Sequence, residues 1–501
     1  MKKIILLFIV LTLTLRGFNQ PKALKSLILQ NAGYSVCVIN ADNGQVVFEN
    51  KQVSLVPASV MKVVTTAAAL SILGPEYIFH TKIGYTGRLD SINGQLKGDL
   101  VLKGGGDPAF YSEYFPEHYR GTFEDWADAI LQKGIKSVSG DLIIDLSHFG
   151  ETSVPGGWVW EDIGNYYGAG VSGLTYSDNQ YKIHFSTPNI AGKPAVIDYL
   201  SPVTDSLRLI NNVLSSDNNK DESIVYGAPG SFSQLIEGTI PKGRSDFIVK
   251  AAMPDPARCA AKAFINVLIL KSIKFSGKIR IEVNSKYGGY VEVADKPSPL
   301  LQDIIIPLNH ESINLFAEHL LREISFVRSS NSNLKGSAEV LKEFWSENKI
   351  FTDGFYPADG SGLSRSNGVC PKTLAEILRY IYLSKNRDVF FNSLPVAGLT
   401  GTLSGSFKGS KLEGNLKAKT GSMTRVRSLA GLFENHNGEK MIFAIITNNF
   451  KGTQSMIGHT IVDLLSELYY FDPPKKKEAI SKVKNLTAEC SGVVKLQPQN
   501  R

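Results

Sequence analysis

Residues 57–62 read Pro-Ala-Ser-Val-Met-Lys and begin an apolar run that continues to residue 73 and contains three consecutive alanines. The run predicts a buried helix with Ser59 at its start, where a backbone N–H can stabilise an oxyanion. One helical turn separates Ser59 from Lys62, so both side chains share a face. Burial disfavours an ammonium ion, which would make Lys62 a neutral base toward the Ser59 hydroxyl. The stretch predicts a serine nucleophile activated by lysine rather than by histidine.

The same Ser-x-x-Lys pattern also begins at residues 332, 346 and 481, in polar surroundings, so the pattern needs a partner elsewhere in the chain. The sequence Lys419-Thr420-Gly421 occurs once, just before a predicted hairpin. On an edge strand, Lys419 and Thr420 would bind a substrate carboxylate, and Gly421 would let another backbone approach closely. The N–H of Ser422 would then complete an oxyanion hole with that of Ser59. The alternative is an ordinary exposed lysine in a turn.

A third element, Ser-x-Asn, is expected between these two segments, where it would relay the proton and bind the substrate amide. Ser312-Ile313-Asn314 stands at the head of the amphipathic stretch 315–324. Residues 177–179 and 216–218 both read Ser-Asp-Asn, but they lie in the predicted inserted region, far from the predicted catalytic helices. Residues 329–331, Ser-Ser-Asn, also match the pattern, but they stand at the end of the predicted helix rather than at its start. We therefore select Ser312 and Asn314.

These motifs resemble the low-molecular-mass class C penicillin-binding proteins, the D-alanyl-D-alanine carboxypeptidase and endopeptidase family. The resemblance covers roughly residues 24–471. It rests on five segments that occur in the family's order: 57–62, Gly-Gly-Gly-Asp-Pro at 104–108, 309–318, Asp-Gly-Ser-Gly-Leu-Ser-Arg at 359–365, and 417–422.

The resemblance implies a role for each matched residue. These roles are nucleophile for Ser59, base for Lys62, proton relay for Ser312, ligand of the substrate amide for Asn314, and carboxylate clamp for Lys419 with Thr420. The chain departs from the family pattern at Ile313, where Asp or Asn is usual, and we expect altered packing there rather than lost activity.

The resemblance also implies an acidic residue over the active-site cleft. Residues 158–162, Trp-Val-Trp-Glu-Asp, match that segment, so Asp162 would pair with the distal ammonium of a diamino acid in the stem peptide. The alternative role for Asp162 is to cap or solvate a loop. Met423, next to Ser422, is also a candidate for a residue that lines the cleft. The alternative is that its side chain packs in the hydrophobic core.

The fold class follows from two predicted hairpins and the helices around them. Residues 34–40 pair with 45–49, and 427–433 pair with 441–448. A short helix at 24–30 and a closing helix at 457–470 would pack side by side, letting both hairpins share a sheet. We expect a mixed α/β (α+β) fold, a serine β-lactamase/transpeptidase-like domain with an antiparallel sheet flanked by helices.

Between the hairpins the pattern changes to short alternating strands with glycine-rich turns, which indicates an inserted β-rich region. At 501 residues the chain exceeds what one hydrophobic core usually supports. The predicted organisation is a signal peptide at 1–21, a catalytic domain at 22–76 and 295–472, an insertion at 77–294 that is one or two subdomains, and a polar tail at 473–501.

Export is indicated by Lys2-Lys3 followed by the apolar run 4–15, which is shorter than the roughly 20 residues that a spanning helix needs. The cleavage site is not evident, and an uncleaved anchor with peripheral membrane contact is the alternative. We expect a periplasmic or cell-envelope location.

The net charge of +7 is spread along the chain apart from Lys475–Lys477, which disfavours nucleic acid binding. The four cysteines form no CxxC pair and predict free thiols rather than zinc or disulfides.

The predicted function is a serine-type D-alanyl-D-alanine carboxypeptidase or endopeptidase that acts on peptidoglycan stem peptides through an acyl-enzyme on Ser59. β-Lactam antibiotics should acylate the same serine, and no metal or organic cofactor is required. One alternative is a β-lactamase, which needs a dedicated deacylating water. The other is a catalytically silent cell-wall binding protein.

Overall fold

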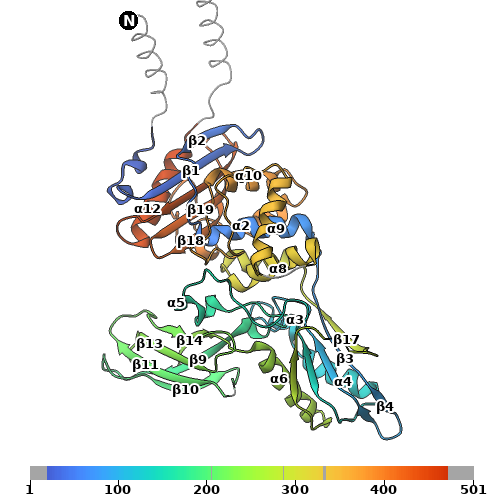
Figure 1. Cartoon of the computed structure of the whole chain (residues 1–501). Coiled ribbons are helices and arrows are strands. Elements are labelled where there is room, and N and C mark those ends of the chain that lie inside the picture. The colour runs from blue at the N-terminus through green and yellow to red at the C-terminus, as the bar shows by residue number, and fades with distance from the viewer. Residues whose placement is uncertain (1–19, 205, 286, 331–333, 472–501) are drawn as a thin grey trace, which may run out of the picture.

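The computed structural model describes residues 20–204, 206–285, 287–330 and 334–471 (Figure 1). Nearly all of the predicted signal peptide and polar tail, with Lys475–Lys477 and Cys490, lies outside these residues. The other three cysteines are free thiols, as predicted. Among the described residues, no helix combines the length and the apolar character needed to cross a membrane.

The central element is a five-stranded antiparallel sheet that contains both predicted hairpins. Its strands are, in spatial order, β18 (Lys417–Met423), β19 (Val426–Glu434), β20 (Lys440–Asn448), β1 (Gly33–Asn40) and β2 (Val46–Asn50). The two hairpins join where β1 pairs with β20 along its whole length, from Gly33 opposite Asn448 to Asn40 opposite Met441. The expected fold class is thus the observed one, and β18 is an edge strand as predicted.

Helices cover both faces of this sheet, so its three central strands are buried at most positions. Val36 and Val38 of β1 face a core that includes α12 (Gln454–Leu468), whereas Cys37 and Ile39 face the opposite core. That second core includes α2 (Met61–Ile72), α7 (Leu301–His310), α8 (Asn314–Ser329), α9 (Leu334–Glu347), α10 (Pro371–Tyr382) and α11 (Arg387–Asn392). It continues into the inserted region, for example through Phe79 and Phe264.

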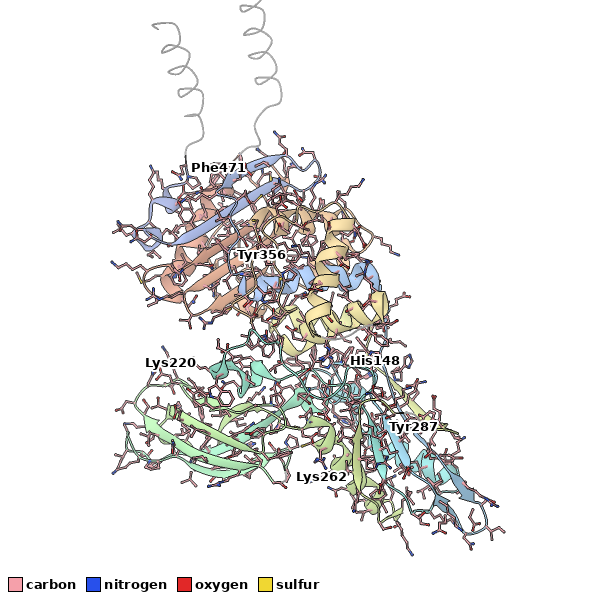
Figure 2. All side chains as sticks on the ribbon, in the orientation of Figure 1. His148, Lys220, Lys262, Tyr287, Tyr356 and Phe471 are labelled. Atoms are coloured by element: carbon pink, nitrogen blue, oxygen red, sulfur yellow. The ribbon has the colours of Figure 1, made fainter. Side chains whose placement is uncertain are left out.

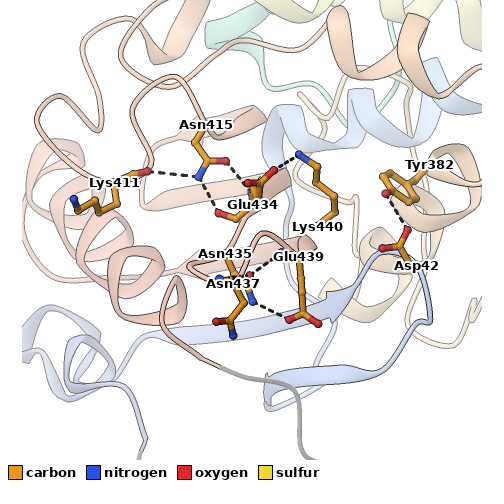
Figure 3. A network of polar contacts seen from close by, with 9 residues as sticks. All are labelled: Asp42, Tyr382, Lys411, Asn415, Glu434, Asn435, Asn437, Glu439 and Lys440. Carbon is orange, nitrogen blue, oxygen red and sulfur yellow. Dashed lines mark hydrogen bonds and ion pairs between the residues drawn. The ribbon is translucent and has the colours of Figure 1, made fainter.

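The turn between β19 and β20 forms where the sequence predicts it (Figure 3). Asn435 Oδ1 accepts hydrogen bonds from the backbone N–H groups of Asn437 and Glu439, at 3.0 and 2.9 Å. Gly438 has a φ of 80°, a conformation that favours glycine. These local bonds help to set the register in which β19 pairs with β20. The edge strand β18 pairs in turn with β19, so its position depends on this hairpin.

The prediction of one short helix at residues 24–30 is wrong. The segment forms two short 3₁₀ turns, η1 (Lys22–Lys25) and η2 (Leu27–Leu29). It packs beside α12 as expected, because Glu467 of α12 accepts hydrogen bonds from the N–H groups of Lys22 and Ala23 at 2.6 and 2.9 Å. These first N–H groups have no acceptor within the turn itself, and the break between the two turns falls at Ser26, whose ψ of 137° is not helical.

The inserted region leaves the helical layer after α2 and returns before α7 (Figure 1). Its first part holds two mixed sheets. One has the order β16 (Ile279–Glu282), β8 (Leu142–Asp145), β6 (Leu100–Lys103), β3 (His80–Tyr85), β17 (Val291–Pro297); the other has the order β15 (Lys274–Phe275), β7 (Ser137–Val138), β5 (Gln95–Lys97), β4 (Arg88–Asp90). The second part holds two three-stranded sheets, β10 (Val196–Ser201), β9 (Gln180–Ser186), β14 (Phe247–Ala252) and β11 (Arg208–Ser216), β13 (Ser233–Pro241), β12 (Ile224–Tyr226).

The insertion also contains helices α4 (Thr122–Gln132) and α6 (Pro256–Leu270). The prediction of short alternating strands in this region did not include them. The two helices accompany parallel pairing of β8 with both β6 and β16. Parallel neighbours need a crossover connection, and these helices lie in the connections. We keep the division at residues 77 and 294 as a proposal. A separate hydrophobic cluster within β9–β14 supports two subdomains in the insertion.

Polar contacts join the insertion to α8. His148, labelled in Figure 2 beside the helical layer, lies with Nε2 2.6 Å from Glu323 Oε2. Tyr77 donates from its hydroxyl to the other oxygen of Glu323 at 2.6 Å. Arg322 donates to Ser153 Oγ at 3.1 Å and to the carbonyl of Phe149. Buried charge-assisted bonds of this kind fix the insertion against the helix that begins at Asn314.

Candidate active site

Ser59 lies in a 3₁₀ turn, η3 (Ala58–Val60), that continues into α2. Ala58, directly before it, has a φ of 48°, an uncommon conformation for a residue other than glycine. Two glycines make room for this turn. A Cβ at Gly362 would stand 2.0 Å from the Ala58 carbonyl oxygen, and a Cβ at Gly421 would stand 3.0 Å from the Ser59 nitrogen. The predicted close approach at Gly421 is therefore an approach to the serine itself.

Lys62 is fully buried on α2, one turn after Ser59. Its Nζ lies 3.0 Å from Ser59 Oγ, 2.6 Å from Asn314 Oδ1 and 2.8 Å from the carbonyl oxygen of Ser361. Burial lowers the pKa of Lys62 to about 7, although the carboxyl groups of Asp359 and Glu318 act in the opposite direction. The lysine is thus able to hold or release a proton near neutral pH.

The Ser-x-Asn element lies where the chain enters α8. Ser312 has a φ of 63° and faces the cavity, and Asn314 is the first residue of the helix. The Asn314 amide donates from Nδ2 to the carbonyl of Tyr167 at 2.8 Å while its oxygen faces Lys62. Asn314 is therefore in contact with the lysine, in addition to any contact it makes with substrate.

Lys419 and Thr420 lie on β18 beside η3. Lys419 is fully buried, and its Nζ donates to the carbonyl of Thr420 at 3.0 Å. Burial lowers the pKa of Lys419 well below its ordinary value, and the positive charge of nearby Lys62 acts in the same direction. Thr420 donates from its hydroxyl to Thr402 Oγ1, or accepts from it, at 2.8 Å. Both residues are buried, and neither is among the residues that line the cavity next to Ser59.

A cavity of about 390 Å³ lies above these groups. It brings together predicted residues from four separate segments of the chain, namely Ser59, Asp162, Ser312, Asn314, Ser422 and Met423. The rejected Ser-Asp-Asn at 177–179 lines a different cavity with Ser177 and Asp178, and the one at 216–218 begins at the end of β11.

Asp162 reaches the cavity from a short helix of the insertion, α5 (Trp160–Ile163). Its side chain is half-buried, which raises its pKa, while a hydrogen bond from the Tyr167 hydroxyl at 3.3 Å and the charge of Arg365 act to lower it. A carboxylate at this wall suits a cationic group on a ligand.

Sequence reasoning gave no role to the buried carboxyl groups behind Lys62. Asp359 accepts from the N–H groups of Gly362 and Ser364 at 2.7 and 2.6 Å. Glu318 accepts from the N–H groups of Gly360 and Ser361, at 2.7 Å for Ser361. Both residues stand in segments that carry the family resemblance, 309–318 and 359–365, and an acidic residue in an otherwise glycine-rich or apolar stretch was the available signal.

Comparison with known proteins agrees with this geometry. The sequence model of the family described as "D-Ala-D-Ala carboxypeptidase 3 (S13) family" matches residues 22–468. The chain belongs to this family. The predicted family and enzyme class are thus confirmed: the chain is a low-molecular-mass class C penicillin-binding protein, a serine hydrolase of the D-Ala-D-Ala carboxypeptidase type.

Individual relatives of this S13 carboxypeptidase are distant but cover most of it. It is 26% identical over 419 residues to D-alanyl-D-alanine carboxypeptidase DacB of Haemophilus influenzae, covering 82% of this chain and 84% of that protein. It is 28% identical over 437 residues to D-alanyl-D-alanine carboxypeptidase of Actinomadura sp. (strain R39), covering 85% and 79%. The crystal structure of penicillin binding protein 4 (dacB) from Haemophilus influenzae superimposes with a TM-score of 0.77 at 26% identity, over 90% of this chain and 99% of that one.

Proposed function

We propose that this S13 carboxypeptidase cleaves the terminal D-Ala-D-Ala bond, or a related D-configured cross-link, of peptidoglycan stem peptides through an acyl-enzyme on Ser59. The observation that carries the proposal is the fully buried Lys62 with Nζ 3.0 Å from Ser59 Oγ. No imidazole is needed, because burial keeps this lysine partly neutral near pH 7.

The surroundings of Lys62 support the direction of proton transfer. A neutral amine has two N–H donors and one lone pair. Asn314 Oδ1 and the Ser361 carbonyl can only accept, so they take the two donors. The lone pair then faces the third neighbour, the Ser59 hydroxyl, which donates its proton. The amine removes that proton as Ser59 Oγ attacks the substrate carbonyl.

The remaining groups fit the other steps of acyl transfer. The N–H groups of Ser59 and Ser422 would stabilise the oxyanion, because Gly421 brings β18 close to the Ser59 nitrogen. Ser312 would relay the proton to the leaving amine, and Asn314 would contact the substrate amide. Lys419 and Thr420 would bind the terminal carboxylate, whose negative charge would favour the charged form of Lys419 and so oppose the burial that lowers its pKa. Water then hydrolyses the acyl-enzyme.

The substrate chemistry and the location belong to the same proposal. Asp162 lines the cavity and would pair with the distal ammonium of a diamino acid. β-Lactams would acylate Ser59 as substrate mimics, a proposal supported by the similarity to penicillin binding protein 4 from Haemophilus influenzae. The basic and apolar start of the sequence supports export to the periplasm or cell envelope, with peripheral membrane contact as an option.

Fluorescent penicillin tests the proposal directly. The protein should be labelled, excess unlabelled drug should compete, and Ser59→Ala should abolish the label. Labelling that persists in Ser59→Ala would remove the assigned nucleophile. Release of D-Ala from a D-Ala-D-Ala peptide by the wild type, with slow turnover of the drug, separates the proposed carboxypeptidase from a β-lactamase and from a silent binding protein.

A further inference from the structure

Two of the three oxygen atoms within hydrogen-bond distance of Lys62 Nζ are connected to one short stretch of the inserted region, one directly and one through a carboxylate. We call this stretch, residues 157–167, the α5 segment. It lies on the side of the insertion that faces α8 and β18 (Figure 1). The two acceptors, Asn314 Oδ1 and the Ser361 carbonyl, come from α8 and from the loop 359–364. The catalytic domain therefore does not fix its own base unaided.

The first connection runs through Trp158. Its indole Nε1–H donates to Asp359 Oδ2 at 2.8 Å, and the side chain is only 6% exposed. Asp359 closes the loop that contains Ser361 by accepting from the N–H groups of Gly362 and Ser364, which follow Ser361 in the chain. A hydrogen bond to a buried carboxylate is stronger than one between neutral groups. Trp158 thus helps to fix the loop that presents the Ser361 carbonyl to Lys62.

The fit between the α5 segment and this loop is tight at one further position. A Cβ on Gly157 would stand 2.1 Å from Ser364 Oγ, whereas a Cβ on the preceding Gly156 would meet nothing within 4 Å. The two adjacent glycines therefore differ in whether they contact the loop.

The second connection runs through the backbone of Tyr167. Its carbonyl oxygen accepts from Asn314 Nδ2 at 2.8 Å. An amide can face Lys62 with either its oxygen or its nitrogen, and only the oxygen can accept from the lysine. The Tyr167 carbonyl takes the nitrogen, so it fixes the orientation in which Asn314 Oδ1 accepts from Nζ at 2.6 Å.

From these two connections we infer that the α5 segment positions the base of the reaction, with Trp158 and the Tyr167 carbonyl acting through Asp359 and Asn314 on Lys62. The inference rests on the proposed function of Ser59 and Lys62. It has a consequence that a purely substrate-binding role for the insertion lacks. Acylation by a small β-lactam, which presents no diamino-acid side chain to Asp162, also depends on the α5 segment.

The test compares two tryptophans that lie two residues apart. Trp158→Phe keeps an aromatic ring but removes the Nε1–H that reaches Asp359. Trp160→Phe makes the same change at a side chain that is 57% exposed and stacks on Tyr226. Rate constants for acylation by a small penicillin are obtained on the full-length protein from time courses scaled to their own end point, so that unfolded molecules, which lower only the amplitude, do not count.

Trp158→Phe should lower the limiting acylation rate about tenfold or more, because a small displacement of a catalytic group greatly reduces the rate of the chemical step. The drug concentration for half-saturation should stay within about twofold, since binding is left intact. Trp160→Phe should match the wild type. A merely structural role for Trp158 would reduce the labelled fraction and the melting temperature while leaving the rate per active molecule unchanged, and that result would overturn the inference.

Gly157→Ala and Gly156→Ala provide a second matched pair that keeps every hydrogen-bonding side chain. Gly157→Ala should slow acylation and Gly156→Ala should not. Equal rates per active molecule in all four variants, in a protein whose Ser59→Ala form is unlabelled, would reject the positioning role and leave the proposed function standing. Labelling of Ser59→Ala would reject the proposed function itself.

Discussion

Acylation of Ser59 should slow about hundredfold between about pH 9 and about pH 5, because the base is a lysine that takes up a proton in this range. Burial lowers the pKa of Lys62 from 10.5 to about 7. At pH 7 about half of the molecules then hold a neutral amine, and at pH 5 about 1% do. A lysine with an ordinary pKa would be neutral in only about 0.03% of molecules at pH 7. The fold thus increases the population of competent base about a thousandfold at neutral pH.

The assay is the second-order rate constant for labelling by fluorescent penicillin, obtained by stopped flow or timed quenching from time courses scaled to their own end point. The logarithm of the rate should rise with unit slope up to about pH 7 and then level off. Lys62→Arg has a side chain that stays protonated, so its residual rate should be small and flat over the same range. A rate that climbs with unit slope to about pH 10 would show that the lysine pKa is not lowered. A wild-type rate that is flat from about pH 5 to about pH 9 would show that Lys62 is not the base.

Three other changes test separate parts of the site. Asn314→Leu removes an acceptor from the Lys62 amine and should lower the acylation rate about tenfold to a hundredfold, measured by the same labelling. Gly421→Ala would place a Cβ 2.7 Å from the Pro57 carbonyl oxygen and 3.0 Å from the Ser59 nitrogen. It should destabilise the fold by about 1–3 kcal/mol in denaturant unfolding and slow labelling. Its control is Gly458→Ala, at a position on α12 where a Cβ meets nothing within 4 Å, which should stabilise by about 0.5–1 kcal/mol. Asp162→Asn should raise KM for a peptide with a distal ammonium but not for one without it, measured by D-Ala release; equal KM changes for both peptides would refute that pairing.

Local sequence signals predicted the elements that depend on near neighbours. The two hairpins, α12 and the helix after Ser59 formed within a few residues of the expected bounds, because turn residues and apolar periodicity act over short distances. The helix predicted at 24–30 failed for the converse reason. The segment leaves helical geometry at Ser26, and its start is held by Glu467, more than four hundred residues away in the chain. The helices of the insertion were missed because short strands with glycine turns dominated the pattern around them.

The candidate site divides in the same way. The pairing of Ser59 with Lys62 is a property of one helical turn and follows from spacing alone. The two acceptors that take the amine's protons, Asn314 Oδ1 and the Ser361 carbonyl, come from remote segments, and no local pattern connects either of them to Lys62. The role of Trp158 could not be predicted either, since its partner Asp359 lies two hundred and one residues away.

The order of amino acids sets which chemical groups this protein has and how the nearest of them are spaced, since a helical turn and a hairpin are fixed by contacts among neighbouring residues. The protonation state of those groups depends on the folded molecule. Whether Lys62 is charged depends on its complete burial under α8, β18 and the loop 359–364, and on carboxyl groups that arrive with those elements. Desolvation and charge act through space rather than along the chain, so the lysine becomes a base only when the whole molecule has folded around it.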